Sequence, residues 1–134
     1  MPLYLADTSA WNRGGQVEKR WANLVERDEL VLCTPVKLEL LYSARSRDYD
    51  SLARDLDGFL HLELDDRTAV AAARAQQALA AGGLHRGPAV TDLLIAAVAE
   101  VHELTLLHYD SHFDAIARVT GQPAEWLARR GSLD

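Results

Sequence analysis

Short apolar runs, each bounded by polar or turn-forming residues, recur along the chain and predict a set of strands. Four of them predict short strands, and a fifth near the end of the chain is expected to be an edge strand. In order, they cover residues 3–6, 29–33, 61–64, 105–108 and 123–127.

Longer segments with apolar residues at three- and four-residue spacing separate these runs and predict helices. They cover residues 10–12, 16–27, 35 to about 45, 49–59, 65 to about 81, 91–103 and 110–120. Strands that alternate with helices imply a parallel sheet with helices on both faces. The predicted fold class is therefore α/β, a three-layer α/β/α sandwich.

Several residues mark the expected ends of these helices. Thr8 or Ser9 is suited to cap the first helix, and Thr34, which a proline follows, is suited to cap the helix after the second strand. Asp65 is expected to cap the long alanine-rich helix, and Gly121 to end the helix that follows the fourth strand.

Composition narrows the class of protein. The chain has 134 residues, of which 49% are hydrophobic and 25% charged, and we expect a single domain over residues 1–134. Its one cysteine, Cys33, lies in an apolar run and is expected to be buried. A formal net charge of −6 counts against broad, charge-driven binding of nucleic acid. No signal peptide or membrane span is predicted, so we expect a cytoplasmic protein.

Acidic residues follow the predicted strands at positions that the fold would bring together. Asp7 directly follows the first strand, and Asp110 follows the fourth. Glu39 lies in the second turn of the helix after the second strand, and Asp92 in the first turn of a strongly apolar helix. Because ligands of open α/β sheets bind beyond the carboxyl ends of the strands, these four side chains are expected at one edge.

Each acid also has a simpler structural interpretation. Asp7 could make an Asx-turn, Asp110 could cap the helix that follows it, and Asp92 could interact with a helix dipole while Thr91 acts as the cap. Glu39 is harder to explain in this way, because its helical neighbours are mostly apolar and no local cation is placed to pair with it. A carboxylate in such surroundings is costly unless it is neutralised or coordinated.

A divalent cation would resolve the repulsion within such a group of carboxylates. Mg²⁺ prefers oxygen ligands, keeps several water molecules, and is commonly held by a few carboxylates together with substrate phosphate. The residues therefore suggest metal-assisted hydrolysis of a phosphodiester.

The motifs that carry these acids resemble those of PIN-domain ribonucleases. The resemblance spans nearly the whole chain and is specific in its order and spacing. It is carried by Leu3-Tyr4-Leu5-Ala6-Asp7-Thr8-Ser9-Ala10, Thr34-Pro35-Val36-Lys37-Leu38-Glu39-Leu40, Thr91-Asp92-Leu93-Leu94-Ile95-Ala96-Ala97 and His108-Tyr109-Asp110-Ser111-His112-Phe113-Asp114. The chain's size and its richness in arginine and alanine are similar to those of the VapC toxins of VapBC toxin–antitoxin modules.

This resemblance implies a Mg²⁺-dependent endoribonuclease in which Mn²⁺ can substitute. It implies that Asp7, Asp92 and Asp110 hold the metal and that Glu39 acts directly or through water. Asp114 stands where some members carry a fifth catalytic acid, and a hydroxyl at Thr8 or Ser9 orients the first aspartate. The implied partners are an RNA substrate, a cognate VapB-type antitoxin and a second copy of the chain in a homodimer, with no membrane.

Three other functions stay open at this point. A non-catalytic regulatory module on the same fold would use the acids as a docking surface or a structural metal site. Transfer through an aspartyl-phosphate fits less well, because Asp7-Thr8-Ser9 lacks the second aspartate or the lysine that such proteins need. A nuclease acting on DNA is the third, and only the family resemblance favours RNA.

Overall fold

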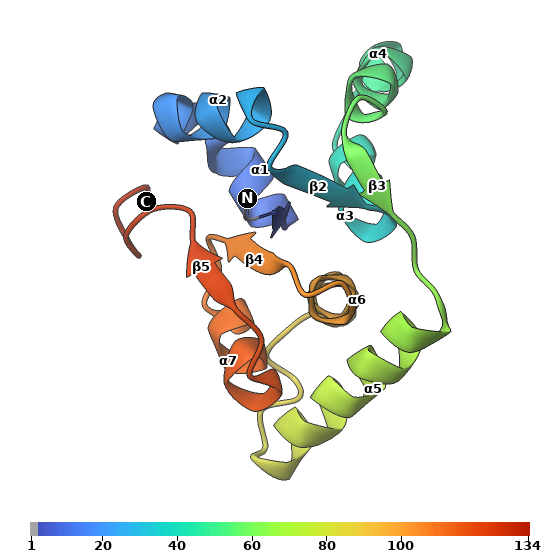
Figure 1. The fold of residues 1–134 in the computed structure, drawn as a ribbon, viewed down its shortest axis with the longest axis vertical. Coiled ribbons are helices and arrows are strands. Elements are labelled where there is room, and N and C mark those ends of the chain that lie inside the picture. The colour runs from blue at the N-terminus through green and yellow to red at the C-terminus, as the bar shows by residue number, and fades with distance from the viewer. Residues whose placement is uncertain (1–2) are drawn as a thin grey trace.

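The computed structural model describes residues 3–134, which form one five-stranded sheet with helices on both sides (Figure 1). The elements run in the order β1 (Tyr4–Ala6), α1 (Thr8–Arg13), a 3₁₀ turn (Gly14–Val17), α2 (Glu18–Glu26), β2 (Leu30–Cys33), α3 (Thr34–Tyr42), α4 (Ser46–Leu56), β3 (Leu60–Leu62), α5 (Asp66–Ala81), α6 (Val90–Val101), β4 (Thr105–His108), α7 (His112–Thr120) and β5 (Ala124–Trp126).

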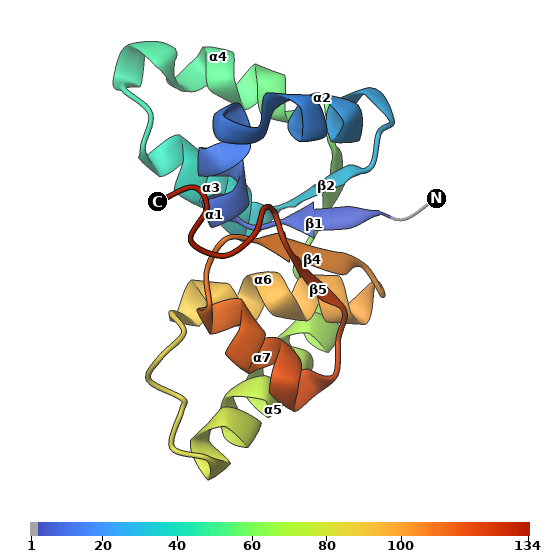
Figure 2. The same cartoon turned by 90° about the vertical axis from the view of Figure 1, so that its left-hand side faces the viewer.

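All strand pairs are parallel, and the strand order is β3-β2-β1-β4-β5. Helices α1 to α4 lie on one face of the sheet, and α5 to α7 lie on the other (Figure 2). This is the predicted three-layer sandwich, and β5 is the predicted edge strand. Because every strand runs in the same direction, all the carboxyl ends meet at one edge.

The buried apolar residues form two clusters, a larger one that contains most of them and a smaller one that includes Ala6, Ala10 and Leu24. All four residues of β2 are buried, including Cys33 as predicted. Five consecutive residues of α6, from Ile95 to Ala99, are also buried, because this helix packs between the sheet, α5 and α7. Among residues 3–134, none of the helices combines the length and the apolar character needed to cross a bilayer.

Two of the predicted helix ends are confirmed in detail. The Asp65 carboxylate accepts a hydrogen bond from the Thr68 backbone N–H at 3.0 Å, and the Thr68 hydroxyl lies 2.8 Å from the backbone N of Asp65. This reciprocal pair begins α5. Gly121 ends α7 with φ of 74°, a left-handed conformation that favours glycine.

Other predicted ends are wrong by a turn or less. Asp7, not Thr8 or Ser9, caps α1, because its carboxylate already reaches the free N–H groups of that helix. Thr34 lies inside α3, and Cys33 occupies the cap position without a side-chain bond. Likewise Ala89, rather than Thr91, occupies the cap position of α6.

Trp11 belongs to an aromatic cluster and not to the acidic edge. Its ring lies edge-on to Trp21 and Phe59, with centroids 5.0 and 5.1 Å away. Trp21 in turn covers Gly14, where a side-chain Cβ would lie 2.8 Å from the indole ring. Trp11 therefore has a packing role, and glycine at position 14 allows the close approach of Trp21.

Candidate metal centre

Asp7 is the most buried of the predicted acids. It follows β1 directly, and its side chain is only 3% exposed. Its carboxylate accepts hydrogen bonds from the Ser9 hydroxyl at 2.7 Å and from the backbone N–H groups of Ser9 and Ala10 at 3.1 and 3.2 Å. The predicted Asx-turn therefore exists, and it fixes this carboxylate at the carboxyl end of the central strand.

Ser9 also links Asp7 to the neighbouring strand. Its hydroxyl accepts a hydrogen bond from the backbone N–H of Tyr109 at 2.9 Å, just beyond the end of β4. A single hydroxyl thus joins two positions 100 residues apart in the chain. The Asx-turn could be read from the sequence, but this contact depends on the pairing of β1 with β4 and could not.

Glu39 is held by the other hydroxyl of α1. The Thr8 hydroxyl donates to Glu39 Oε1 at 2.6 Å, from a position 31 residues earlier in the chain. No ion pair to Glu39 forms among the described residues. The carboxylate that lacked a local cation in the sequence therefore has a neutral donor in the fold.

Asp92 and Asp110 are held by backbone donors instead. Asp92 Oδ2 accepts from the backbone N–H of Ala89 at 2.9 Å, and Asp110 Oδ1 accepts from that of His112 at 2.9 Å. One ligand atom from each of Asp92, Asp110 and His112 lies within 4.8 Å of the others. His112 Nδ1 is 3.4 Å from Asp110 Oδ1, so this histidine lies beside the acids.

Asp114 has different neighbours from the other four acids. Both of its oxygens accept from Trp126 Nε1, at 3.1 and 3.2 Å, and Oδ1 is 3.6 Å from His108 Nε2. Asp114 therefore links α7, on which it lies, to β5, and it is outside the group formed by Asp92, Asp110 and His112. Its partner Trp126 lies on the edge strand, and no signal in the sequence connects the two residues.

Burial and mutual repulsion shift the pKa values of two of these carboxyls. Burial raises the pKa of Asp7 to about 7, and nearby Asp92 adds to the increase, although the hydrogen bonds from Ser9 and Ala10 oppose it. The pKa of Asp92 is also raised, first by burial and then by the negative charges of Asp110 and Glu39. Burial is the main cause of both shifts, and the negative charges of neighbouring carboxylates add to it.

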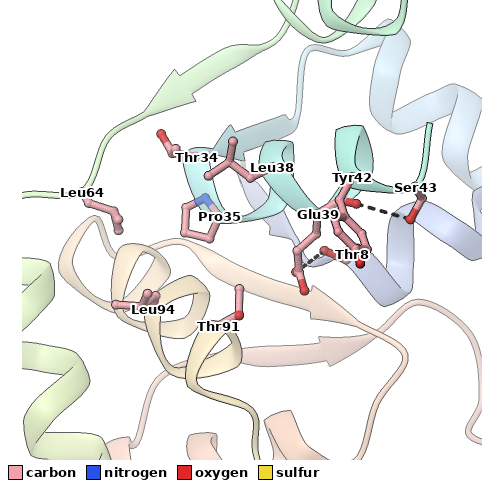
Figure 3. Close-up of a pocket in the computed structure, with 10 residues that line it drawn as sticks. All are labelled: Thr8, Thr34, Pro35, Leu38, Glu39, Tyr42, Ser43, Leu64, Thr91 and Leu94. Atoms are coloured by element: carbon pink, nitrogen blue, oxygen red, sulfur yellow. Dashed lines mark hydrogen bonds between the residues drawn. The ribbon is translucent and has the colours of Figure 1, made fainter. Parts of the chain in front are cut away.

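A pocket of about 520 Å³ opens beside these acids between α3 and α6 (Figure 3). Its walls carry hydroxyl groups and aliphatic side chains together with Glu39, and they are formed by Thr8, Thr34, Pro35, Leu38, Glu39, Tyr42, Ser43, Leu64, Thr91 and Leu94. Tyr42 is 91% exposed on its rim, one turn beyond Glu39. Glu39 is thus the acid that lines this pocket, whose other walls are apolar and hydroxyl surfaces.

Comparison with known proteins gives a consistent result. Residues 4–119 match the PIN domain family. The chain is 41% identical to Ribonuclease VapC18 of Mycobacterium tuberculosis, over 98% of this chain and 99% of that protein. It is 40% identical to Ribonuclease VapC51 of the same species, over 98% and 97% respectively.

Solved structures show the same fold. A toxin–antitoxin structure, VapBC-5 from Mycobacterium tuberculosis, matches 93% of this chain and 98% of its own with a TM-score of 0.62 and 26% identity. VapBC2 from Rickettsia felis, bound to a DNA fragment from its promoter, matches 92% and 98% with a TM-score of 0.75, although only 20% of residues are identical. The chain therefore belongs to the PIN-domain family and, within it, to the VapC group.

Proposed function

We propose that this chain is a metal-dependent endoribonuclease and the toxin of a type II toxin–antitoxin pair, with residues 1–134 acting as one nuclease unit. One observation carries the proposal most directly. Asp7, Glu39, Asp92 and Asp110, which are far apart in the sequence, share one sheet edge, and burial and mutual charge raise the pKa values of Asp7 and Asp92. Such a group is unfavourable alone and becomes favourable around a cation.

The residues present fit a hard divalent ion such as Mg²⁺, for which Mn²⁺ would substitute. Asp7, Asp92 and Asp110 would hold it, and Glu39 would contact it directly or through water. When bound, the ion supplies a Lewis acid for the phosphodiester and lowers the pKa of a bound water. The chain itself contributes orientation, because Ser9 holds Asp7 and Thr8 holds Glu39.

RNA is the proposed substrate because the curated relatives are named ribonucleases. The pocket between α3 and α6 would receive nucleotides next to the scissile phosphate, with aliphatic faces for bases and hydroxyls for hydrogen bonds. With a net charge of −6, the protein would rely on the metal and on a few local cations rather than on a broad basic face.

The proposed partner is a VapB-type antitoxin, because the related solved structures are of VapBC complexes. An antitoxin segment that entered the same pocket would exclude RNA. A homodimer and a cytoplasmic site of action, where RNA and antitoxin meet, belong to the same proposal.

The test is RNA cleavage by the full chain purified without antitoxin. Transfer, ribosomal and messenger RNA are incubated with Mg²⁺ or Mn²⁺, with and without EDTA, and with the variants Asp7→Asn and Asp92→Asn. Asp50→Asn is the matched control, because Asp50 is an exposed aspartate on α4. We expect cleavage by the wild type and the control, and none with EDTA or with either site variant, once circular dichroism shows that the variants are folded.

Two outcomes would contradict the proposal. Equal cleavage by the wild type and both site variants would mean that the activity comes from elsewhere. Mn²⁺ binding without cleavage of any of the RNA classes would favour the non-catalytic regulatory module instead.

A further inference from the structure

His108 is a buried histidine next to the candidate metal centre. The proposed chemistry gives this residue no role. It ends β4, two residues before Asp110, and its side chain is 0% exposed. Its ring packs between Phe113 and Trp126, with centroids 5.5 and 4.9 Å away. A polar ring is costly in such surroundings unless its nitrogens have partners, so the neighbours of each nitrogen matter.

The two ring nitrogens of His108 face different groups. The backbone N–H of Asp110 donates to Nδ1 at 3.3 Å, so Nδ1 carries a lone pair and the ring proton belongs on Nε2. Nε2 is buried and has no hydrogen-bond partner among the described residues. The acceptor it faces is Asp114 Oδ1 at 3.6 Å, slightly too far for a hydrogen bond and close enough to form one after a small shift.

Asp114 is fixed from its other side by the edge strand. Trp126 Nε1 donates to both carboxylate oxygens, and the backbone N–H of Leu127 donates to the carbonyl oxygen of His108 at 2.7 Å. A continuous series of contacts therefore runs from Trp126 through Asp114 and His108 to the backbone of Asp110. None of these contacts uses an oxygen of Asp7, Asp92 or Glu39.

We propose that Asp114 is a positioning residue rather than a metal ligand: it orients the Nε2–H of His108, whose Nδ1 holds the backbone N–H of Asp110 and so places the Asp110 carboxylate. This inference rests on the proposed function, because it gives Asp114 a role in the metal centre of that nuclease. A residue that acts through a neighbour needs only an acceptor atom, whereas a ligand carboxylate also supplies the negative charge that attracts the cation.

The experiment compares two substitutions that separate acceptor from charge. Asp114→Asn keeps an oxygen that accepts from both Trp126 and His108, and Asp114→Leu removes it at similar size. Mn²⁺ affinity of the full chain is measured by isothermal titration calorimetry, with Asp110→Asn as the example of a lost ligand. We expect Asp114→Asn to bind Mn²⁺ nearly as well as the wild type, and Asp114→Leu to bind it about tenfold or more weakly, the usual effect of losing an outer-sphere contact.

A second measurement does not depend on whether Asp114→Leu folds. Nitrogen-15 NMR of the wild-type histidine rings is expected to show His108 as the Nε2–H tautomer. Trp126→Phe, which keeps the ring stacking but removes the indole donor, is expected to weaken Mn²⁺ binding less than Asp114→Leu does.

Three results would overturn the proposal. They are a loss of Mn²⁺ affinity in Asp114→Asn as large as in Asp110→Asn, wild-type affinity in Asp114→Leu, and an Nδ1–H tautomer for His108. Because these readouts do not involve RNA, a wild-type chain that binds Mn²⁺ but cleaves nothing would refute the nuclease proposal alone.

Discussion

The two sides of the metal centre hold their carboxylates with different donors. On the side of α1, Asp7 and Glu39 receive hydrogen bonds from the hydroxyls of Ser9 and Thr8. On the side of α6 and α7, Asp92 and Asp110 receive them from backbone N–H groups three and two residues away. Although Asp7 also has a local Asx-turn, the α1 side therefore depends on two particular hydroxyls and on their long-range bonds to Glu39 and Tyr109, whereas the other side depends mainly on local turns.

The two sides of the metal centre also differ in how deeply their acids are buried. Asp7 is enclosed, and burial is the main cause of its raised pKa, so its charge is unfavourable in the metal-free protein. Asp110 is only half-buried and stands at the open side of the site. The side that holds Asp7 therefore has the larger electrostatic cost of keeping a carboxylate charged in the metal-free protein. A bound cation would reduce that cost.

The largest expected effect concerns Asp7 and pH in the metal-free protein. Because the folded-state pKa of Asp7 is about 7 and its ordinary value is 3.8, the folded state favours the protonated form. Stability from this group is therefore full below pH 3.8 and is lost as pH rises through about 7, by at most about 4 kcal/mol at about 1.4 kcal/mol per pKa unit. Urea unfolding in EDTA at pH 5 and pH 8 measures the loss.

Asp7→Asn is the matched comparison for this prediction, because it removes the charge and keeps an oxygen at Oδ1 for the Ser9 hydroxyl and the Ala10 N–H, and only the Ser9 N–H loses its acceptor. We expect the variant to lose less stability than the wild type between pH 5 and pH 8. The same pH dependence in both proteins would show that Asp7 titrates normally and that burial does not raise its pKa.

Ser9→Ala is expected to have the next largest effect, because the Ser9 hydroxyl forms hydrogen bonds just beyond the ends of both β1 and β4. The substitution leaves the buried N–H of Tyr109 without its acceptor, which costs about 1–3 kcal/mol of unfolding free energy. It also removes one of the three hydrogen bonds to the Asp7 carboxylate, and we expect Mn²⁺ affinity to fall about 10- to 100-fold. Urea unfolding and calorimetry measure the two effects, and Ser9→Thr, which keeps the hydroxyl, is expected to restore most of both.

Ala89→Pro removes a backbone donor on the side of α6 and α7, and its effect is expected to be the smallest of the three. Proline removes the N–H that donates to Asp92 and suits the φ of −68° found at this position. Because Asp92 stays in place on α6, we expect Mn²⁺ affinity to fall by less than in Ser9→Ala, with stability changed by less than about 1 kcal/mol. A larger loss than in Ser9→Ala would reverse the comparison between the two sides.

Local patterns were enough to predict much of this fold. The apolar runs located all five strands within about two residues, and the Asp65 and Gly121 signals marked helix ends that the structure confirms. The cap of α1 was assigned wrongly, because Asp7, Thr8 and Ser9 are all good cap residues and their order of preference depends on where β1 ends. Propensity alone does not distinguish adjacent candidates of this kind.

Some features of the candidate site could likewise be predicted from the sequence, and others could not. The Asx-turn at Asp7 and the positions of the acids after the strands followed from the sequence and from the geometry of parallel sheets. The bonds from Thr8 to Glu39 and from Trp126 to Asp114 did not, because they depend on how α1 sits against α3 and how β5 sits against α7. Contacts of this kind are determined by packing and have no local pattern.

The bond between the Ser9 hydroxyl and the Tyr109 N–H also has a consequence for synthesis of the chain. A ribosome makes Asp7 and Ser9 first and Tyr109 and Asp110 about a hundred residues later. β1 has no β4 to pair with until then, and the acids on α3 and α6 have no common edge to share. A nascent chain therefore carries no assembled metal centre until β4 and Asp110 have been made, so the ribosome that makes the protein is not exposed to a finished site before then.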